Sequence, residues 1–180
     1  AMTPENLHRV VFTPADGETA KRFLPASPQS TGARPEDLWN WLEMTSDRLG
    51  IDFVAIPHNS NGSNGLMFAR TQWDGSAIDR SWAERRARNE PMVEVLQIKG
   101  QSETLPILSP EDEWAAFEMA PWRTLNPSLS SRPVGSYVRD ALKAGLRLRE
   151  NIGANPYQLG MIGSKPATTC LFGNRMLSRM

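Results

Sequence analysis

The chain has 180 residues, of which 39% are apolar and 22% charged, and its formal net charge is zero. This length suits one domain with a hydrophobic core, and six Trp and six Phe exclude a disordered composition. The balanced charge argues against binding nucleic acid through overall charge, and a single cysteine excludes an internal disulfide. No apolar run approaches the length of a membrane span.

The first third of the chain predicts a strand, a long connection, a helix and a second strand. Residues 8–13, HRVVFT, have the composition of a strand, and residues 14–33 are rich in Pro, Ser and Gly, which predicts an irregular connection. Residues 34–50 begin with Pro and acidic residues and end at a glycine, as a helix does. Residues 51–58, IDFVAIPH, predict a strand buried on both faces, as in a parallel sheet. The predicted inner face of the helix consists of Leu38, Trp41, Leu42, Thr45 and Leu49.

The rest of the chain predicts further helices and strands in alternation. Helices are expected over about 77–89, over 109–119 and over 132–153, and strands over 92–100 and 157–164. The basic cluster ERRAR is interpreted as a solvated helix face. This alternation predicts an α/β fold with a mostly parallel sheet, in which functional sites gather at the carboxyl ends of the strands.

The polar loop after the second strand is the least ordinary stretch of the sequence. His58 directly follows the apolar run, and Asn59, Asn61 and Asn64 come next among serines and glycines. A neutral imidazole at a strand end can bind a metal or transfer a proton, and asparagine amides can orient a bound anion or water. The same residues also fit a tight turn, because asparagine tolerates the left-handed conformation. The residues by themselves leave both interpretations open.

The third predicted strand carries a second polar group. Strict alternation places Glu94 on one face of that strand, and Gln97 and Lys99 on the other. A buried Glu94 requires a partner, which is either a basic side chain or a metal. Lys99 suits a phosphate or carboxylate but also suits a solvated strand end, and Glu103 follows just beyond it. His8 lies at a strand start and is expected to play no part in a site.

Long blocks of the sequence resemble, in order, a large bacterial family known as domain of unknown function 3604, which is related to the PHP (polymerase and histidinol phosphatase) metalloesterases. The blocks are NLHRVVF, IPHNSNGSNG, RNEPMVEVLQIKGQSE, LSPEDEWAAFE, GSYVRDALKAGL and NPYQLGMIGS, and they span residues 5–164. The resemblance implies an α/β fold that is a partial, distorted TIM-like barrel of the PHP type, with mostly parallel strands and covering helices. It also implies metal-dependent hydrolysis of a small phosphoester-like substrate.

By the same resemblance, His58 and Glu94 would bind a divalent metal, which is zinc, manganese or iron in the family. The implied pocket residues are Asn59, Asn61, Asn64, Gln97, Lys99 and Glu103. The family's Asp-Leu-His-x-His and Ser-x-Asp-x-His motifs have no counterpart here, and residues 165–180 look unrelated to it. We therefore expect residues 1–180 to be a single domain, the central fragment of a PHP-like barrel, inactive or weakly metal-binding by itself.

A barrel without its terminal strands exposes sheet edges, so we expect a second copy of the chain to cover the open edge. No nucleic-acid or membrane partner is expected, and the bacterial cytoplasm and periplasm both suit the sequence. Two other functions fit the residues. One is a non-catalytic binding or assembly module that uses the strand-end pocket or the exposed edge. The other is a complete small enzyme in which His58 and either Glu94 or Glu103 form a general acid–base pair.

Overall fold

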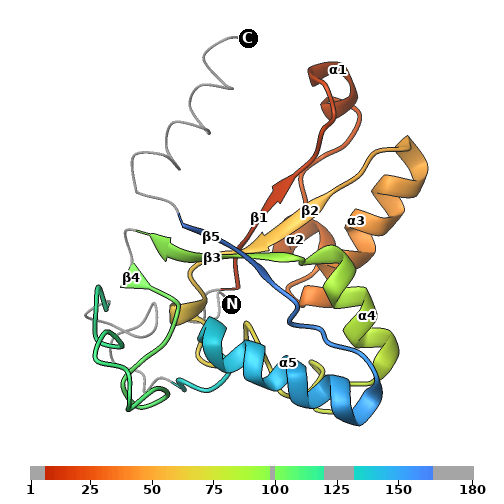
Figure 1. Ribbon diagram of the computed structural model, residues 1–180. Helices are drawn as coiled ribbons and strands as arrows, with labels where there is room; N and C mark the ends of the chain where they lie inside the picture. Colours follow the sequence, from red (N-terminus) through yellow and green to blue (C-terminus); the bar gives the residue numbers. More distant parts are fainter. Residues whose placement is uncertain (1–6, 98–99, 120–131, 164–180) are drawn as a thin grey trace.

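The structure is a computed structural model and describes residues 7–97, 100–119 and 132–163 (Figure 1). Its strands are β1 (Arg9–Phe12), β2 (Val54–Pro57), β3 (Met92–Gln97), β4 (Gly100–Gln101) and β5 (Gly160–Gly163). Its longer helices are α3 (Pro35–Leu49), α4 (Arg80–Asn89) and α5 (Val138–Ile152), and its short ones are α1 (Gly17–Ala20), α2 (Pro28–Thr31) and the 3-10 turn η1 (Ser60–Gly62). No helix within the described ranges combines the length and the hydropathy that crossing a lipid bilayer requires.

The strands form two small sheets rather than part of a barrel. In one sheet β1 pairs with β2 in antiparallel register, with Arg9 opposite Pro57. In the other, β3 is central, antiparallel to β4 and parallel to β5. The described strands do not close into a barrel, and antiparallel pairs outnumber the single parallel pair among them. The predicted PHP-type barrel of mostly parallel strands is therefore wrong.

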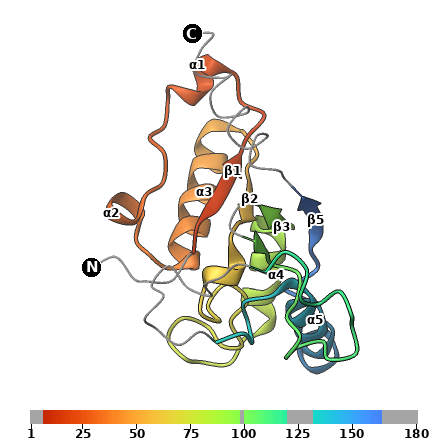
Figure 2. The same cartoon turned by 90° about the vertical axis from the view of Figure 1, so that its left-hand side faces the viewer.

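The connection between β1 and β2 explains the antiparallel pair. After α1 the chain returns past α2 to the far end of α3, and α3 then runs back toward α1 (Figure 2). Because of this return, β2 enters the sheet at the end where β1 leaves it, so the two strands run in opposite directions. A strand–helix–strand pattern predicts a parallel pair only when the helix itself makes the return crossing. Here the segment that contains α1 and α2 makes it instead.

Among the described residues the apolar core has two clusters, and the buried guanidinium of Arg86 lies near aromatic rings of both. The first cluster joins α5 to β3 and the loop before α4, and the second joins α3 to α4. The first cluster contains Met67, Phe68, Val93, Val138, Ala141, Ala144 and Tyr157. The second contains Trp39, Ile78, Trp82, Ala83 and Ala154.

Helix α3 buries a different tryptophan from the one predicted. Leu42 and Thr45 are buried as expected, but the fully buried indole is that of Trp39, whose ring centroid lies 5.2 Å from that of Trp82. Trp41 is half-buried and packs against Phe53 at a centroid distance of 5.5 Å. The helix has apolar residues on two sides because α4 covers one side and the segment around α1 covers the other.

Two predicted helices differ in the structure. Residues 109–119 form successive turns, in which Asp112 accepts hydrogen bonds from the Trp114 backbone N–H (2.9 Å) and from Arg139 (2.5 Å). Such side-chain bonds compete with the helical backbone. The long helix begins at Val138 instead of residue 132, because Gly135 has a φ of 81° and passes close to the backbone of Gly65.

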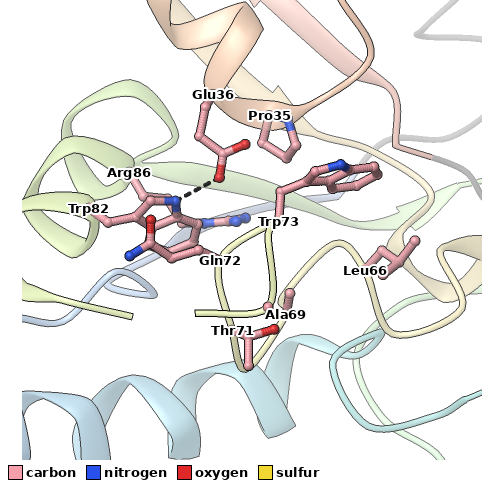
Figure 3. A pocket seen from close by; sticks show the side chains of 10 residues that line it. Pro35, Glu36, Leu66, Ala69, Thr71, Gln72, Trp73, Trp82 and Arg86 are labelled. Carbon is pink, nitrogen blue, oxygen red and sulfur yellow. Dashed lines mark hydrogen bonds between the residues drawn. The ribbon is translucent and has the colours of Figure 1, made fainter. Parts of the chain in front are cut away.

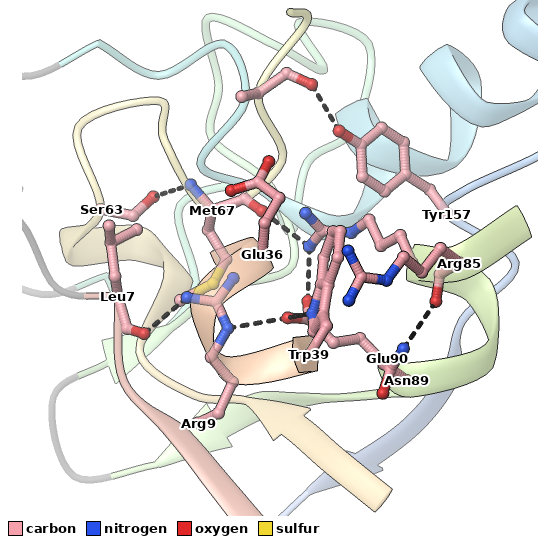
Figure 4. Close-up of polar contacts among 12 residues, drawn as sticks. Leu7, Arg9, Glu36, Trp39, Ser63, Met67, Arg85, Asn89, Glu90 and Tyr157 are labelled. Carbon is pink, nitrogen blue, oxygen red and sulfur yellow. Dashed lines mark hydrogen bonds and ion pairs between the residues drawn. The ribbon is translucent and has the colours of Figure 1, made fainter. Parts of the chain in front are cut away.

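Helices α3 and α4 are joined by polar contacts that reach into the core. The indole N–H of Trp82 donates to Glu36 at 2.7 Å (Figure 3). Deeper in the interior, Arg9 and the indole N–H of Trp39 both donate to Glu90, each at 2.9 Å (Figure 4). Arg86 pairs with the other oxygen of Glu90 at 2.8 Å, and its side chain is 1% exposed.

Candidate functional site

The carboxyl end of β2 lies beside β3, and this is where part of the predicted set of site residues meets (Figure 1). His58 directly follows Pro57, the last residue of β2, and its backbone N–H donates to the carbonyl of His8 at 3.2 Å. The two imidazole rings are stacked, with centroids 6.4 Å apart and planes 18° apart. His8, which the sequence assigned no role, is therefore a neighbour of the candidate site.

His58 and Glu94 form the central contact of the site. Nδ1 of His58 lies 2.6 Å from Oε2 of Glu94, and the side chains are 20% and 6% exposed. Because a carboxylate oxygen accepts, the shared hydrogen is assigned to Nδ1, and Nε2 is then the acceptor for the Asn59 amide N–H at 2.8 Å. The ring is thus held at both nitrogens.

An irregularity in β3 places Gln97 on the same side as Glu94. The register with β5 shifts between Glu94 and Leu96, which leaves Val95 as an extra residue. Nε2 of Gln97 consequently lies 3.4 Å from Nδ1 of His58, so both side chains reach the same imidazole. The expected alternation, with Gln97 on the opposite face, is wrong because a bulge shifts the phase of every later residue.

The asparagines of the polar loop have separate roles. Asn59 is in the left-handed conformation with a φ of 55°, and its Oδ1 is buried without a hydrogen-bond partner among the described residues. The backbone N–H of Asn61 donates to the hydroxyl oxygen of Ser102 at 3.3 Å. Asn64 is also left-handed, and its Oδ1 accepts from the backbone N–H of Arg132 at 2.8 Å. Asn59 also donates its side-chain amide N–H to Nε2 of His58.

Glu103 lies at a different cavity, and Lys99 lies outside the described residues. Glu103 accepts from Arg139 at 2.8 Å, and Arg139 also donates to Asp112. These two carboxylates raise the pKa of Arg139 above its ordinary value. The surrounding cavity has a volume of about 440 Å³ and includes Trp114 among its lining residues.

The family model described as "Protein of unknown function (DUF3604)" matches residues 1–175. The chain belongs to this family. No curated protein and no solved structure matches the chain. Because the description of the DUF3604 family names no activity, the function of this member has to be argued from its own residues.

The DUF3604 site offers donors that suit a divalent cation. An imidazole nitrogen and a carboxylate are ligands for zinc, manganese and iron, and the unpartnered Oδ1 of Asn59 is a further oxygen donor at the same place. Within the part of the chain that the structure describes, no group of three or more His, Cys, Asp or Glu side chains is arranged to hold a metal. The donor types fit a metal, and His58 with Glu94 would supply two protein ligands.

A buried polar network around Arg86 was not predicted from the sequence of this DUF3604 chain. Arg86, in the cluster interpreted as a solvated face, lies 4.9 Å from the ring centroid of Tyr157 and donates to the carbonyl of Met67 at 2.8 Å. Burial by itself raises the pKa of Glu90, but Arg86 and Arg9 outweigh it and hold the pKa below its ordinary value. Only the spacing of Arg86 and Glu90, one helical turn apart, signals such a pair in the sequence.

Proposed function

We propose that this DUF3604 chain carries part of the divalent metal site of a hydrolase that acts on phosphoester-like bonds. The observation that supports the proposal best is the 2.6 Å contact between His58 and Glu94 beside the unpartnered Oδ1 of Asn59. Imidazole, carboxylate and amide oxygen together suit zinc, manganese or iron. The resemblance to a family related to the PHP metalloesterases supports the same chemistry.

The residues of the chain have distinct tasks in this proposal. His58 and Glu94 would hold the ion, which when bound supplies Lewis acidity toward a phosphoryl oxygen. Asn59 donates its amide N–H to Nε2 of His58, so it would have to release this nitrogen before His58 binds the ion. Gln97 presents an amide near the same imidazole, and this amide would bind an oxygen of the substrate. Glu103 and Arg139 neutralise each other and take no part.

Weak metal binding follows from the small number of strong ligands. Affinity rises with the number of protein ligands that are already oriented, and two ligands leave most coordination positions to water. The chain by itself is therefore expected to bind metal weakly and to turn over slowly, as a part of a larger catalytic unit.

Calorimetric titration with Mn²⁺ and Zn²⁺, together with hydrolysis of bis(p-nitrophenyl) phosphate, tests the proposal. His58→Ala and Glu94→Gln should each weaken metal binding by about tenfold or more and remove any metal-stimulated hydrolysis. Glu103→Gln is the matched control, because it removes a carboxylate that pairs with Arg139 instead. Equal metal affinity in the Glu94→Gln and Glu103→Gln variants would contradict the proposal.

A second candidate function is metal-independent general acid–base catalysis by His58. It is favoured by the same 2.6 Å contact, because a carboxylate on Nδ1 orients a histidine whose Nε2 exchanges protons. Asn59 would have to release Nε2 for this role. Hydrolysis that persists in excess chelator and disappears in His58→Ala identifies this mechanism.

We also propose that a second copy of the chain covers the edge of β1. Among the described strands β1 pairs only with β2, so its other edge is not paired by any of them. Val10, Val11 and Phe12 are 36%, 36% and 54% exposed. A strand edge with apolar side chains favours pairing with another chain.

A further inference from the structure

A small cavity outside the His58–Glu94 site lies between α3, α4 and residues 66–75 (Figure 3). Its volume is about 120 Å³, enough for the head group of a small ligand. The side chains that matter for its chemistry are Pro35, Glu36, Gln72, Trp73, Trp82 and Arg86. It shares no lining residue with the contacts of His58, so it is an independent feature of the molecule.

Only one of the two oxygens of the Glu36 carboxylate has a hydrogen-bond partner among the described residues. One oxygen accepts from the indole N–H of Trp82 at 2.7 Å, and Oε2 is buried without a hydrogen-bond partner among the described residues. Arg86 also lines the cavity; its guanidinium pairs with Glu90 and donates to the carbonyl of Met67, and its Nε is buried without a hydrogen-bond partner among the described residues. A buried carboxylate oxygen without a donor costs free energy, which a ligand with N–H groups would relieve.

Trp73 is held at the edge of this cavity by a closed hairpin. The backbone N–H of Gln72 donates to the carbonyl of Ser76 at 2.9 Å, and that of Gly75 donates to the carbonyl of Gln72 at 3.0 Å. The side-chain amide of Gln72 donates to the carbonyl of Ala77 at 2.9 Å. Trp73 nevertheless remains 45% exposed, so the turn presents an indole to solvent instead of burying it.

We propose that this cavity binds a primary alkylammonium group. The N–H donors of the ligand would bond to Oε2 of Glu36, and its positive charge would lie against the indole of Trp73, whose face attracts cations. A carboxylate ligand would meet the charge of Glu36, and a quaternary ammonium would leave Oε2 without a donor. The head group belongs either to a small free amine or to a lysine side chain of a peptide.

NMR titration of the full chain with butylammonium tests the proposal through the indole N–H resonances of Trp73 and Trp82. Both should shift saturably, whereas tetramethylammonium and butyrate at equal concentration should leave them unchanged. Glu36→Gln should weaken binding by about tenfold or more, since it removes the charge but keeps an acceptor for Trp82. Trp73→Ala should weaken it by about threefold to fivefold.

Two matched variants control for charge and for aromatic surface. Glu84→Gln removes a carboxylate on the outside of α4, where it pairs with Arg80, and should bind butylammonium as the parent chain does. Trp114→Ala removes another exposed indole, 69% exposed, and should also leave binding unchanged. Circular dichroism of each variant establishes that it is folded.

The same titration distinguishes the two sources of the head group. Tighter binding of Nα-acetyl-lysine amide than of butylammonium would assign the site to a lysine side chain in a peptide, and weaker or equal binding would assign it to a free amine. The proposal is overturned if butylammonium causes no saturable shift. It is also overturned if Glu36→Gln binds as the parent does, or if tetramethylammonium binds equally well.

Discussion

The imidazole of His58 and the carboxylate of Glu94 meet at 2.6 Å although 36 residues separate them in the chain. The 3-10 turn η1, the hairpin that carries Trp73 and the whole of α4 lie between them in sequence. Their meeting depends on β2 and β3 lying side by side, and it brings an imidazole and a carboxylate together where the carboxyl end of β2 lies beside β3.

Asn59 is predicted to serve both the backbone and the imidazole, and two substitutions separate these roles. Asn59→Ala should lower the free energy of unfolding by about 1–2 kcal/mol, because alanine is strained at a φ of 55°. Asn59→Gly relieves that strain, so it should be closer to the parent in stability, yet it also loses the contact with Nε2. Urea unfolding measures the first effect, and the linewidth of the His58 ring resonances in NMR measures the second. Equal stability of the two variants would contradict the backbone role.

Glu90 is predicted to be the principal anchor of the buried charge network. Glu90→Gln leaves the guanidinium groups of Arg86 and Arg9 without their anion, which should lower the free energy of unfolding by roughly 3–5 kcal/mol. Glu84→Gln on the exposed side of the same helix should change it by less than about 1 kcal/mol. Urea unfolding at neutral pH compares the two, and similar losses would contradict the prediction.

The same carboxylate makes stability depend on pH in a defined direction. Arg86 and Arg9 hold the pKa of Glu90 in the folded chain below its ordinary value of 4.5, in spite of its burial. The unfolded chain therefore takes up the proton first as pH falls. The contribution of Glu90 is complete above about pH 4.5 and is lost as pH falls further, through the folded-state pKa. Unfolding curves between neutral pH and acid should accordingly fall more steeply for the parent chain than for Glu90→Gln.

Gly135 is predicted to be required for a close contact between two loops. A Cβ at this position would lie 2.4 Å from the carbonyl oxygen of Gly65, and φ is 81°. Gly75 has a similar φ of 87° but nothing within 4 Å of its would-be Cβ. Gly75→Ala should therefore cost about 1–2 kcal/mol of backbone strain, and Gly135→Ala about 1–3 kcal/mol more. Equal losses in thermal unfolding would show that the loops can move apart.

Assembly through β1 is predicted to respond to one charge on its edge. Val11→Lys should shift the chain toward the monomer in light scattering coupled to size exclusion, because a lysine on a strand edge opposes pairing with a second copy. Leu146→Lys is the control, since Leu146 is 60% exposed on α5, far from β1 in both views (Figures 1 and 2). A parent chain that light scattering shows to be monomeric at high concentration would contradict this proposal.

Local signals in the sequence predicted most of the elements. Helix α3 was expected over 34–50 and covers Pro35–Leu49. Proline fits its first turn, and Gly50 ends the helix in the left-handed conformation with a φ of 66°. The strands β1, β2, β3 and β5 and the helix α4 were also found close to their expected ranges, whereas β4 was not predicted as a separate strand. The helix predicted over 109–119 is absent, because Asp112 accepts from the nearby backbone N–H of Trp114 and from the distant Arg139, a partner that local patterns do not record.

The candidate site was predicted as a set of residues, and only part of that set meets. His58, Asn59, Glu94 and Gln97 come together, whereas Glu103 pairs with Arg139 at another cavity. The bulge at Val95 was not predicted, because nothing in a run of alternating residues marks where an extra one is inserted.

The sequence by itself determined where most of the strands and helices form and which residues are candidates for a site, because capping, apolar spacing and side-chain type act over a few neighbours. Only the tertiary structure decided the direction in which β1 meets β2, the burial of Arg86 against Glu90, and the meeting of His58 with Glu94. Each of these depends on contacts between segments far apart in the chain, whose free energies are comparable to or larger than local preferences.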